Sequence, residues 1–191
     1  TEVANTISYT RQLSVPLSVS KMHVLTIDVI THNIPSMPRT LRAELRQTKP
    51  FRSLCEEALL SVARTEAVGR EHVERVLAPH GLSMTQYNVL RILRGAGEAG
   101  LCRREIGERL ITRMPDVSRL LDRMEDAGHI RRVRSTEDRR LVNTMLTPAG
   151  RALVDGLDGP VQDTLHARFD HMSDVQLRTL IDLLSLARNR P

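Results

Sequence analysis

Apolar residues recur every three or four positions along most of this chain, and this spacing predicts a mainly helical protein. Residues 41–77 carry the pattern first, and residues 87–93 carry it again after a capping box at Ser83–Gln86. A shorter helix is expected at Arg104–Leu110, with Ile106 facing inward. The chain is therefore predicted to build its core from packed helices.

A further helix is expected from Pro115 to Gly128, in the sequence PDVSRLLDRMEDAG. Thr112 is expected to cap it, Pro115 suits its first turn, and Gly128 suits a left-handed end. The spacing i, i+3, i+4 and i+7 predicts one buried stripe, formed by Val117, Leu120, Leu121 and Met124. The opposite face then presents polar side chains, namely Asp116, Ser118, Arg119, Asp122 and Arg123.

Residues 130–147 change to short β-branched runs, which predict a hairpin directly after that helix. The expected tip carries Glu137, Asp138, Arg139 and Arg140. A helix fits the wide major groove of duplex DNA, and arginines at a hairpin tip reach the narrower, more electronegative minor groove. The pattern therefore predicts a winged helix-turn-helix that binds DNA.

The C-terminal part predicts two more helices. Thr147–Pro148 opens the first, in which Gly156, Gly159 and Pro160 are expected to bend or break the helix. A second capping box at Ser173–Gln176 starts the last helix, which has a broad apolar stripe. An apolar face near a chain end needs a partner, and the same helix of a second subunit is the simplest one.

Residues 1–38 differ from the rest of the chain, because they are rich in Ser, Thr and Val and poor in charge. Met22–Ile30 alternates enough to predict a lone strand. The segment is expected to be an N-terminal extension, either disordered or non-native. The alternative is an arm that pairs with a partner subunit.

Composition adds a modest basic character. The formal net charge is +5, from 28 basic and 23 acidic residues. Lys21 and Lys49 are the two lysines, so arginine supplies the other 26 basic residues. Arginine presents a planar fork to phosphates and to guanine edges, although a GC-rich genome also favours it.

Several function classes are not expected. The chain has no glycine-rich phosphate loop, nucleophile elbow or HExxH motif, so neither catalysis nor a cofactor is predicted. Cys55 and Cys102 lack the spacing of metal ligands. No apolar run approaches about 18 residues, so no membrane contact is expected and a cytoplasmic location is predicted.

The order of these segments resembles that of the MarR family of bacterial transcription regulators. The similarity covers about Leu41 to Arg188 and is most specific in Asp138–Arg140 followed by Leu146–Gly150. The resemblance implies a two-fold homodimer built by terminal helices, with one helix and one wing of each subunit on DNA. It also implies that small phenolic or other ligands, or cysteine oxidation, release many members from their operators.

The resemblance also implies a domain map and a set of DNA contacts. The winged domain is expected at 39–188, with a DNA-binding core at about 83–147 and dimerisation helices at about 41–78 and 148–188. Asp138 matches an acid that braces an arginine at the wing tip. The expected DNA contacts are Arg113, Pro115, Asp116, Ser118, Arg119, Arg123, Arg134, Asp138, Arg139 and Arg140.

Alternatives remain open for some of these residues. Asp116 either accepts from a cytosine amino group or caps its own helix. Arg119 and Arg123 are otherwise solvated residues paired with Asp122 or Asp126. On the expected strand, arginines alternate between the two faces, so only some of Arg131, Arg132 and Arg134 are placed to reach phosphate.

The sequence offers three further candidate sites: an effector pocket, a redox thiol and a metal site. An effector pocket is expected around Tyr87 and Leu90, unless these residues only form core. Cys55 is a candidate redox thiol, but Glu56 and Glu57 follow it, so a plain buried cysteine is favoured. His166 and Asp170 with His171 lack a further ligand, so no metal site is predicted.

The sequence thus predicts a sequence-specific transcriptional regulator without a catalytic step. It is expected to be a homodimeric repressor on double-stranded DNA with a palindromic operator, released by a small-molecule effector. The alternatives are a winged-helix adaptor that binds proteins without reading DNA, and a thiol-based redox sensor that uses Cys55.

Overall fold

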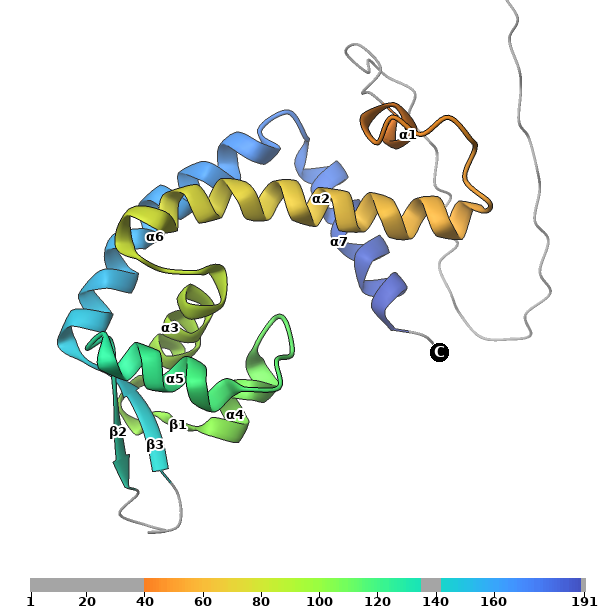
Figure 1. Cartoon of the computed structure of the whole chain (residues 1–191). Helices are drawn as coiled ribbons and strands as arrows, with labels where there is room; N and C mark the ends of the chain where they lie inside the picture. Colours follow the sequence, from red (N-terminus) through yellow and green to blue (C-terminus); the bar gives the residue numbers. More distant parts are fainter. Residues whose placement is uncertain (1–39, 135–141, 190–191) are drawn as a thin grey trace, which may run out of the picture.

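The computed structural model describes residues 40–134 and 142–189, which contain seven α-helices and a three-stranded sheet (Figure 1). It opens with the short α1 (Leu41–Glu44) and the long α2 (Leu54–Leu77), which ends in a 3₁₀ turn at Ala78–His80. The expected extension, with its strand at Met22–Ile30, lies outside the described residues.

The helical pattern expected over residues 41–77 is divided between α1 and α2, because the chain leaves the helix between them. Arg46 takes a positive φ of 50° just after α1, and Pro50 disfavours a helical conformation at the residue before it. Ser53 then caps α2 by accepting from the backbone N–H of Glu56 at 3.1 Å.

Three helices form the centre of the winged lobe, which we define as residues 82–147. They are α3 (Met84–Ala96), α4 (Arg103–Arg109) and α5 (Val117–Asp126). The capping box of α3 is confirmed, since Ser83 N donates to Gln86 Oε1 at 2.8 Å and Gln86 N donates to Ser83 Oγ at 3.3 Å.

The hairpin expected after α5 is confirmed, with β2 (Ile130–Arg134) antiparallel to β3 (Val142–Leu146). Gly128 takes a φ of +73° before it, the left-handed conformation expected for that position. A further strand, β1 (Leu101–Cys102), pairs with the other edge of β3 and gives the order β1-β3-β2. Two residues are too few for a periodic pattern, so the sequence did not predict this strand.

The last two helices are α6 (Pro148–Phe169) and α7 (Asp174–Arg188). Pro160 lies inside α6, and the helix continues through it along a curved path (Figure 1). Of the two expected outcomes, the helix bends and does not break. The second capping box is also confirmed at the start of α7, by reciprocal bonds between Ser173 and Gln176.

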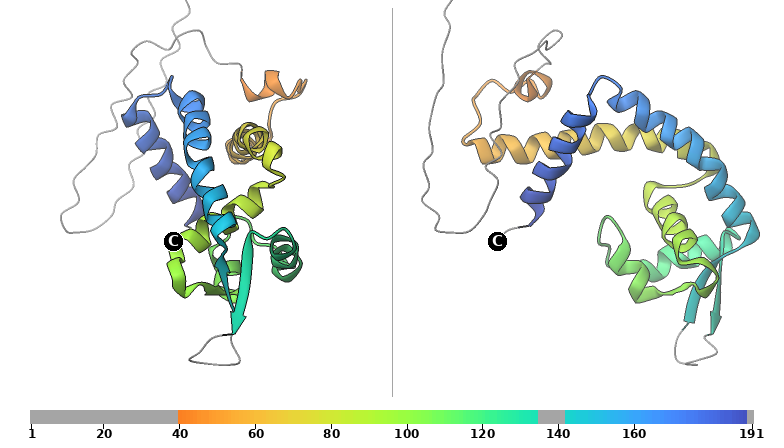
Figure 2. Two further views of the ribbon diagram at one scale, coloured as in Figure 1. Left: turned by 90° about the vertical axis from the view of Figure 1, so that its left-hand side faces the viewer. Right: turned by 180° about the vertical axis from the view of Figure 1, so that it is seen from behind.

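The core lies where α3, α4, α5 and the hairpin meet α6, and α2 packs beside α6 (Figure 2). In contrast, α7 has no buried residue among those described. Large apolar side chains are exposed on α7 and on the first half of α2, namely Leu54, Leu59, Val62, Val175, Ile181, Leu183 and Leu186. We call these seven residues the exposed apolar set. No described helix is long and apolar enough to cross a bilayer.

Candidate nucleic-acid interface

The winged lobe holds α5 by one face and leaves the other open. Leu120, Leu121 and Met124 are buried, and Val117 packs against the same cluster, so the predicted stripe is confirmed. Ile106 of α4 is fully buried in the same core. The polar face of α5 therefore points away from the core.

The start of α5 agrees with one of the two roles expected for Asp116, the helix cap, and differs from the roles expected for Thr112 and Pro115. Thr112 is not the cap and Pro115 is not in the first turn, because α5 begins at Val117 and Asp116 is its N-cap. Asp116 Oδ1 accepts from the backbone N–H of Arg119 at 3.0 Å. A carboxylate at this position also interacts favourably with the helix dipole, so Asp116 fixes the start of the helix.

The open face of α5 is built around Arg119 and Arg123. The Arg119 side chain is 85% exposed, and its Nε lies 3.0 Å from Asp116 Oδ2 rather than beside Asp122 or Asp126. Arg123 donates from Nε to the backbone carbonyl of Arg119 at 3.2 Å. Together with Asp122, these arginines line a surface depression of about 390 Å³.

Other predicted contacts lie around this face. Arg113 and Pro115 are exposed in the turn before α5. Ser118 Oγ accepts from Arg103 Nη1 at 3.1 Å, so Arg103 of α4 orients a residue of α5. The sequence did not predict this role of Arg103, because Arg103 and Ser118 are 15 residues apart and a contact between two helices leaves no local pattern.

The hairpin is tied to α5 by Arg132, which was expected only as a strand arginine that alternates with its neighbours. Its Nε donates to Glu125 Oε2 at 2.7 Å and its Nη2 to Asp122 Oδ1 at 2.6 Å. The hydrogen bond from Arg132 lowers the pKa of Glu125. In return, the hydrogen bonds to Glu125, the larger influence, and to Asp122 raise the pKa of Arg132. Arg132 thus positions the hairpin through its carboxylate partners, although it is exposed like Arg131 and Arg134.

The predicted wing-tip contacts, Asp138, Arg139 and Arg140, lie outside the described residues. β2 ends and β3 begins at the same end of the sheet (Figure 1). The three residues therefore stay predictions.

A second ionic cluster joins the winged lobe to α6. Arg94 donates from Nη1 to Asp155 at 2.9 Å and to Asp158 at 2.6 Å, and its Nη2 donates to Asp158 Oδ1 at 3.0 Å. The hydrogen bonds from Arg94 lower the pKa of Asp158. Three directed bonds from one guanidinium fix α3 against α6.

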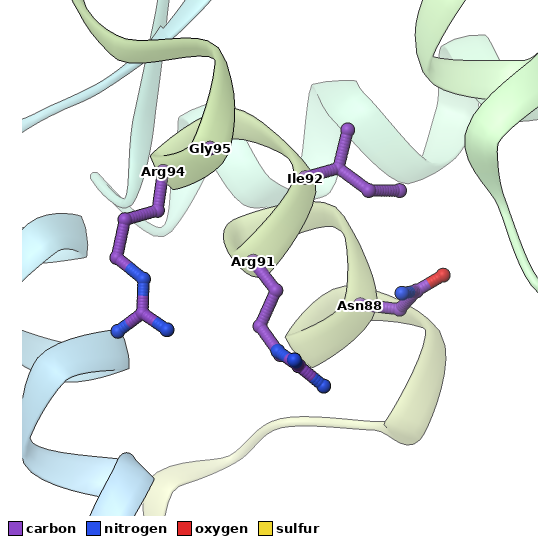
Figure 3. Close-up of a pocket in the computed structure, with 5 residues that line it drawn as sticks. All are labelled: Asn88, Arg91, Ile92, Arg94 and Gly95. Atoms are coloured by element: carbon purple, nitrogen blue, oxygen red, sulfur yellow. The ribbon is translucent and has the colours of Figure 1, made fainter.

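One open depression of about 530 Å³ lies on α3, lined by Asn88, Arg91, Ile92, Arg94 and Gly95 (Figure 3). The predicted effector residues lie next to it but inside the core, since Tyr87 and Leu90 are both buried. The guanidinium of Arg91 lies 5.9 Å from the centre of the Tyr87 ring. Burial, the largest influence, raises the pKa of the Tyr87 hydroxyl.

The favoured interpretation of Cys55 is wrong, because its side chain is exposed rather than buried. It follows the N-cap of α2, where the helix extends beyond the winged lobe. His171 and Asp170 lie 3.9 Å apart after α6. In the described part of the chain, no three His, Cys, Asp or Glu side chains form a metal-binding group.

The sequence of this chain is similar to those of known transcription regulators. The profile of the MarR family matches residues 82–142, which is the helix-turn-helix and the start of the hairpin. The transcriptional regulator TtmR of Methylorubrum extorquens is 36% identical over 124 residues, which cover 60% of this chain and 62% of TtmR. The chain thus spans less than two thirds of that relative. The regulator YpoP of Bacillus subtilis is 30% identical over 104 residues, 54% of this chain and 72% of YpoP.

A solved structure agrees over a longer span. The MarR transcription factor of Planctomyces limnophilus is 36% identical, with a TM-score of 0.55, over 72% of this chain and 99% of that protein. The predicted mainly helical winged fold is confirmed by this match, and a regulator without a catalytic step agrees with it. The chain belongs to the MarR family of DNA-binding transcription regulators.

Proposed function

We propose that this chain is a homodimeric repressor that binds a palindromic operator and leaves it when a small molecule binds. The observation that carries the proposal is the open face of α5, where Arg119 and Arg123 stand above a fully packed apolar stripe. A helix held in this way presents its side chains to the major groove without reorganising the core. By name, IacR of Pseudomonas putida is a repressor, and it is 22% identical over 125 residues.

The homodimer is supported by the exposed apolar set. Leu54 is 84% exposed and Leu186 is 71% exposed, although both are large apolar side chains. Scattered exposure of this kind is common, but no described residue of α7 is buried, and Leu177, Leu180 and Leu184 are only partly covered. A second copy would cover α7 and the first half of α2 together, and it would place two α5 helices on one DNA duplex.

Two α5 helices related by a two-fold axis fit half-sites about 34 Å apart, which is one turn of the duplex. The operator is therefore expected to be a palindrome. Exposed arginines around α5, together with the wing-tip pair Arg139 and Arg140, would supply phosphate and groove contacts. The logarithm of the binding constant should fall linearly with the logarithm of the salt concentration, with a slope of about −0.9 for each phosphate neutralised.

The effector is expected to bind the depression on α3 (Figure 3). The Arg91 guanidinium, the Asn88 amide and the Ile92 side chain line it, whereas the guanidinium of Arg94 is already paired with Asp155 and Asp158. The occupant would therefore combine a negative charge, facing Arg91, with an apolar part. BpsR of Bordetella bronchiseptica, a fold neighbour at 19% identity and a TM-score of 0.65, is regulated in its DNA binding by 6-hydroxynicotinic acid. An effector of our chain would act by favouring a dimer whose lobes do not match the operator spacing.

A second candidate function, a redox sensor, is favoured by the exposed thiol of Cys55. The thiol sits beside Leu54 of the exposed apolar set, so oxidation would place polar oxygen next to the proposed dimer interface. Hydrogen peroxide should then dissociate the native chain from DNA, whereas a Cys55→Ser variant should stay bound to DNA. Equal binding by both chains after oxidation would reject the redox function.

The main test is fluorescence anisotropy with duplex from immediately upstream of the gene and with a scrambled duplex, at several salt concentrations. Sedimentation velocity on the same samples gives the stoichiometry. Tight binding of one dimer to the upstream duplex, with weak binding to the scrambled one, is the expected result. No binding to either duplex at low salt would reject the DNA-binding function in favour of a protein-binding adaptor.

A further inference from the structure

Asp116 and Arg119 form an unusual pair at the start of α5. One carboxylate contacts two parts of the same arginine, since Oδ1 accepts from Arg119 N at 3.0 Å and Oδ2 forms an ion pair with the guanidinium, 3.0 Å from Arg119 Nε. The Arg119 side chain is nevertheless 85% exposed. It is therefore held near its base and open at its tip.

We propose that Arg119, oriented by Asp116, reads a guanine in the major groove and sets one base preference in each half-site. The proposal rests on the proposed operator binding and names the base that α5 recognises. Asp116 is a positioning residue in this scheme, because it acts on DNA only through Arg119.

The hydrogen-bond donors of Arg119 support guanine. A guanidinium has five N–H donors, and the ion pair with Asp116 is closest at Nε. The two terminal nitrogens stay available as a planar fork, which matches the O6 and N7 acceptors of guanine. Asp116 already limits the side-chain rotamers of Arg119, so less conformational entropy is lost when the fork meets a base.

The charge of the pair also favours a base over a phosphate. Asp116 compensates the positive charge of Arg119, and a phosphate contact rewards net positive charge. A guanine edge is neutral and rewards directed donors instead. Arg123 differs, because its Nε donates to a backbone carbonyl and no carboxylate among the described residues lies within ion-pair distance of it. The two arginines are thus suited to different tasks, Arg119 to a base and Arg123 to a phosphate.

Four variants of the full chain separate these roles in a binding-site selection from a pool of randomised duplexes. Arg119→Ala removes the fork, and Arg119→Lys keeps the charge without the bidentate geometry. Asp116→Asn removes the charge but keeps the cap, because Asn caps a helix as well as Asp does. Asp126→Asn is the matched control, since Asp126 is exposed on the same helix and makes no ion pair within the described residues. Thermal melting checks that each variant folds.

The native chain should select guanine at one position of each half-site, with other bases bound roughly 5- to 150-fold more weakly. Both Arg119 variants should lose the preference at that position and keep the others. Asp116→Asn should weaken it by about two- to five-fold, which is the range of an exposed ion pair. The same variant should bind scrambled duplex more tightly, because a negative charge near the phosphates is gone. Asp126→Asn should keep the guanine preference.

Three results would overturn the proposal. If Arg119→Ala binds every sequence more weakly but selects the same bases, then Arg119 contacts phosphate. If Asp116→Asn and Asp126→Asn select identically to the native chain, then Asp116 does not position the arginine. If the native chain selects no sequence at all, the operator-binding proposal fails first, and this one fails with it.

Discussion

The first turn of α6 passes so close to the hairpin that residue 150 has no room for a side chain. A Cβ on Gly150 would lie 1.9 Å from the carbonyl oxygen of His129 and 2.8 Å from the carbonyl carbon. Carbon–oxygen contacts are normally about 3.3 Å or longer, so roughly 1.4 Å of separation is missing. Both atoms belong to the backbone, which cannot turn away as a flexible side chain does.

The cost of Gly150→Ala follows from what the His129 carbonyl does. It accepts from Thr147 N at 3.1 Å, and a shift of more than 1 Å would break that bond. The Thr147 hydroxyl has a single proton and lies closer to the Gly128 carbonyl, at 2.7 Å, so its bond would survive. One lost hydrogen bond costs about 1 kcal/mol, and overpacking adds about 1–3 kcal/mol. Alanine regains up to about 1 kcal/mol in a helix. The net expected loss in the free energy of unfolding is about 1–3 kcal/mol.

Gly156→Ala is the matched control, because Gly156 lies in the same helix and has nothing within 4 Å of an added Cβ. It should raise the free energy of unfolding by up to about 1 kcal/mol. Urea unfolding followed by circular dichroism measures both variants, at one protein concentration because a dimer's stability depends on it. If Gly150→Ala unfolds at the same urea concentration as the native chain, the argument from close approach is refuted.

Three more predictions concern the ionic clusters and the exposed apolar set. Asp158→Asn should cost about 1 kcal/mol at pH 7. The Asp158 carboxyl has a lowered pKa in the fold, so this stabilisation exists above the unfolded pKa of about 3.9 and disappears as the pH falls through the folded value. The urea midpoints of the Asp158→Asn variant and of the native chain should therefore approach each other as the pH falls from 7 to 3. Arg132→Lys cannot span both carboxylate partners, so hydrogen exchange in β2 should speed up, and unchanged exchange would contradict the clamp. Ile181→Asp with Leu186→Asp should turn a dimer into a monomer in sedimentation velocity, and an intact dimer would exclude α7 from the interface.

Local signals were enough to predict most of the helical fold. The Ser83 and Ser173 caps lie next to the helices they start, and the stripe of α5 is visible within ten residues. The same holds for the hairpin, whose β-branched runs flank one short tip. Each of these features depends on neighbours in the sequence, which is why a reading of residue types sufficed.

Other features depend on contacts that no local pattern records. Arg94 and Asp158 are 64 residues apart, and Arg103 reaches Ser118 across a turn. Cys55 is exposed because α2 extends beyond the winged lobe, which its own apolar neighbours did not reveal. The cap of α5 was left between two residues for a different reason, since Thr112 and Asp116 are both good N-caps and only the folded turn decides in favour of Asp116.

If the proposed effector binds the proposed dimer, the ionic contacts determine which part of the molecule would move. Within the winged lobe, α5 is tied to α4 through Ser118 and to β2 through Arg132, and its apolar stripe is fully packed. Arg94 ties α3 in turn to α6. An effector that moved α5 alone would have to break these contacts, whereas a change in the angle between two subunits would break none of them. The spacing of the two lobes, set by α2, α6 and α7, is therefore the element that a ligand on α3 would change with the least loss of stabilising contacts.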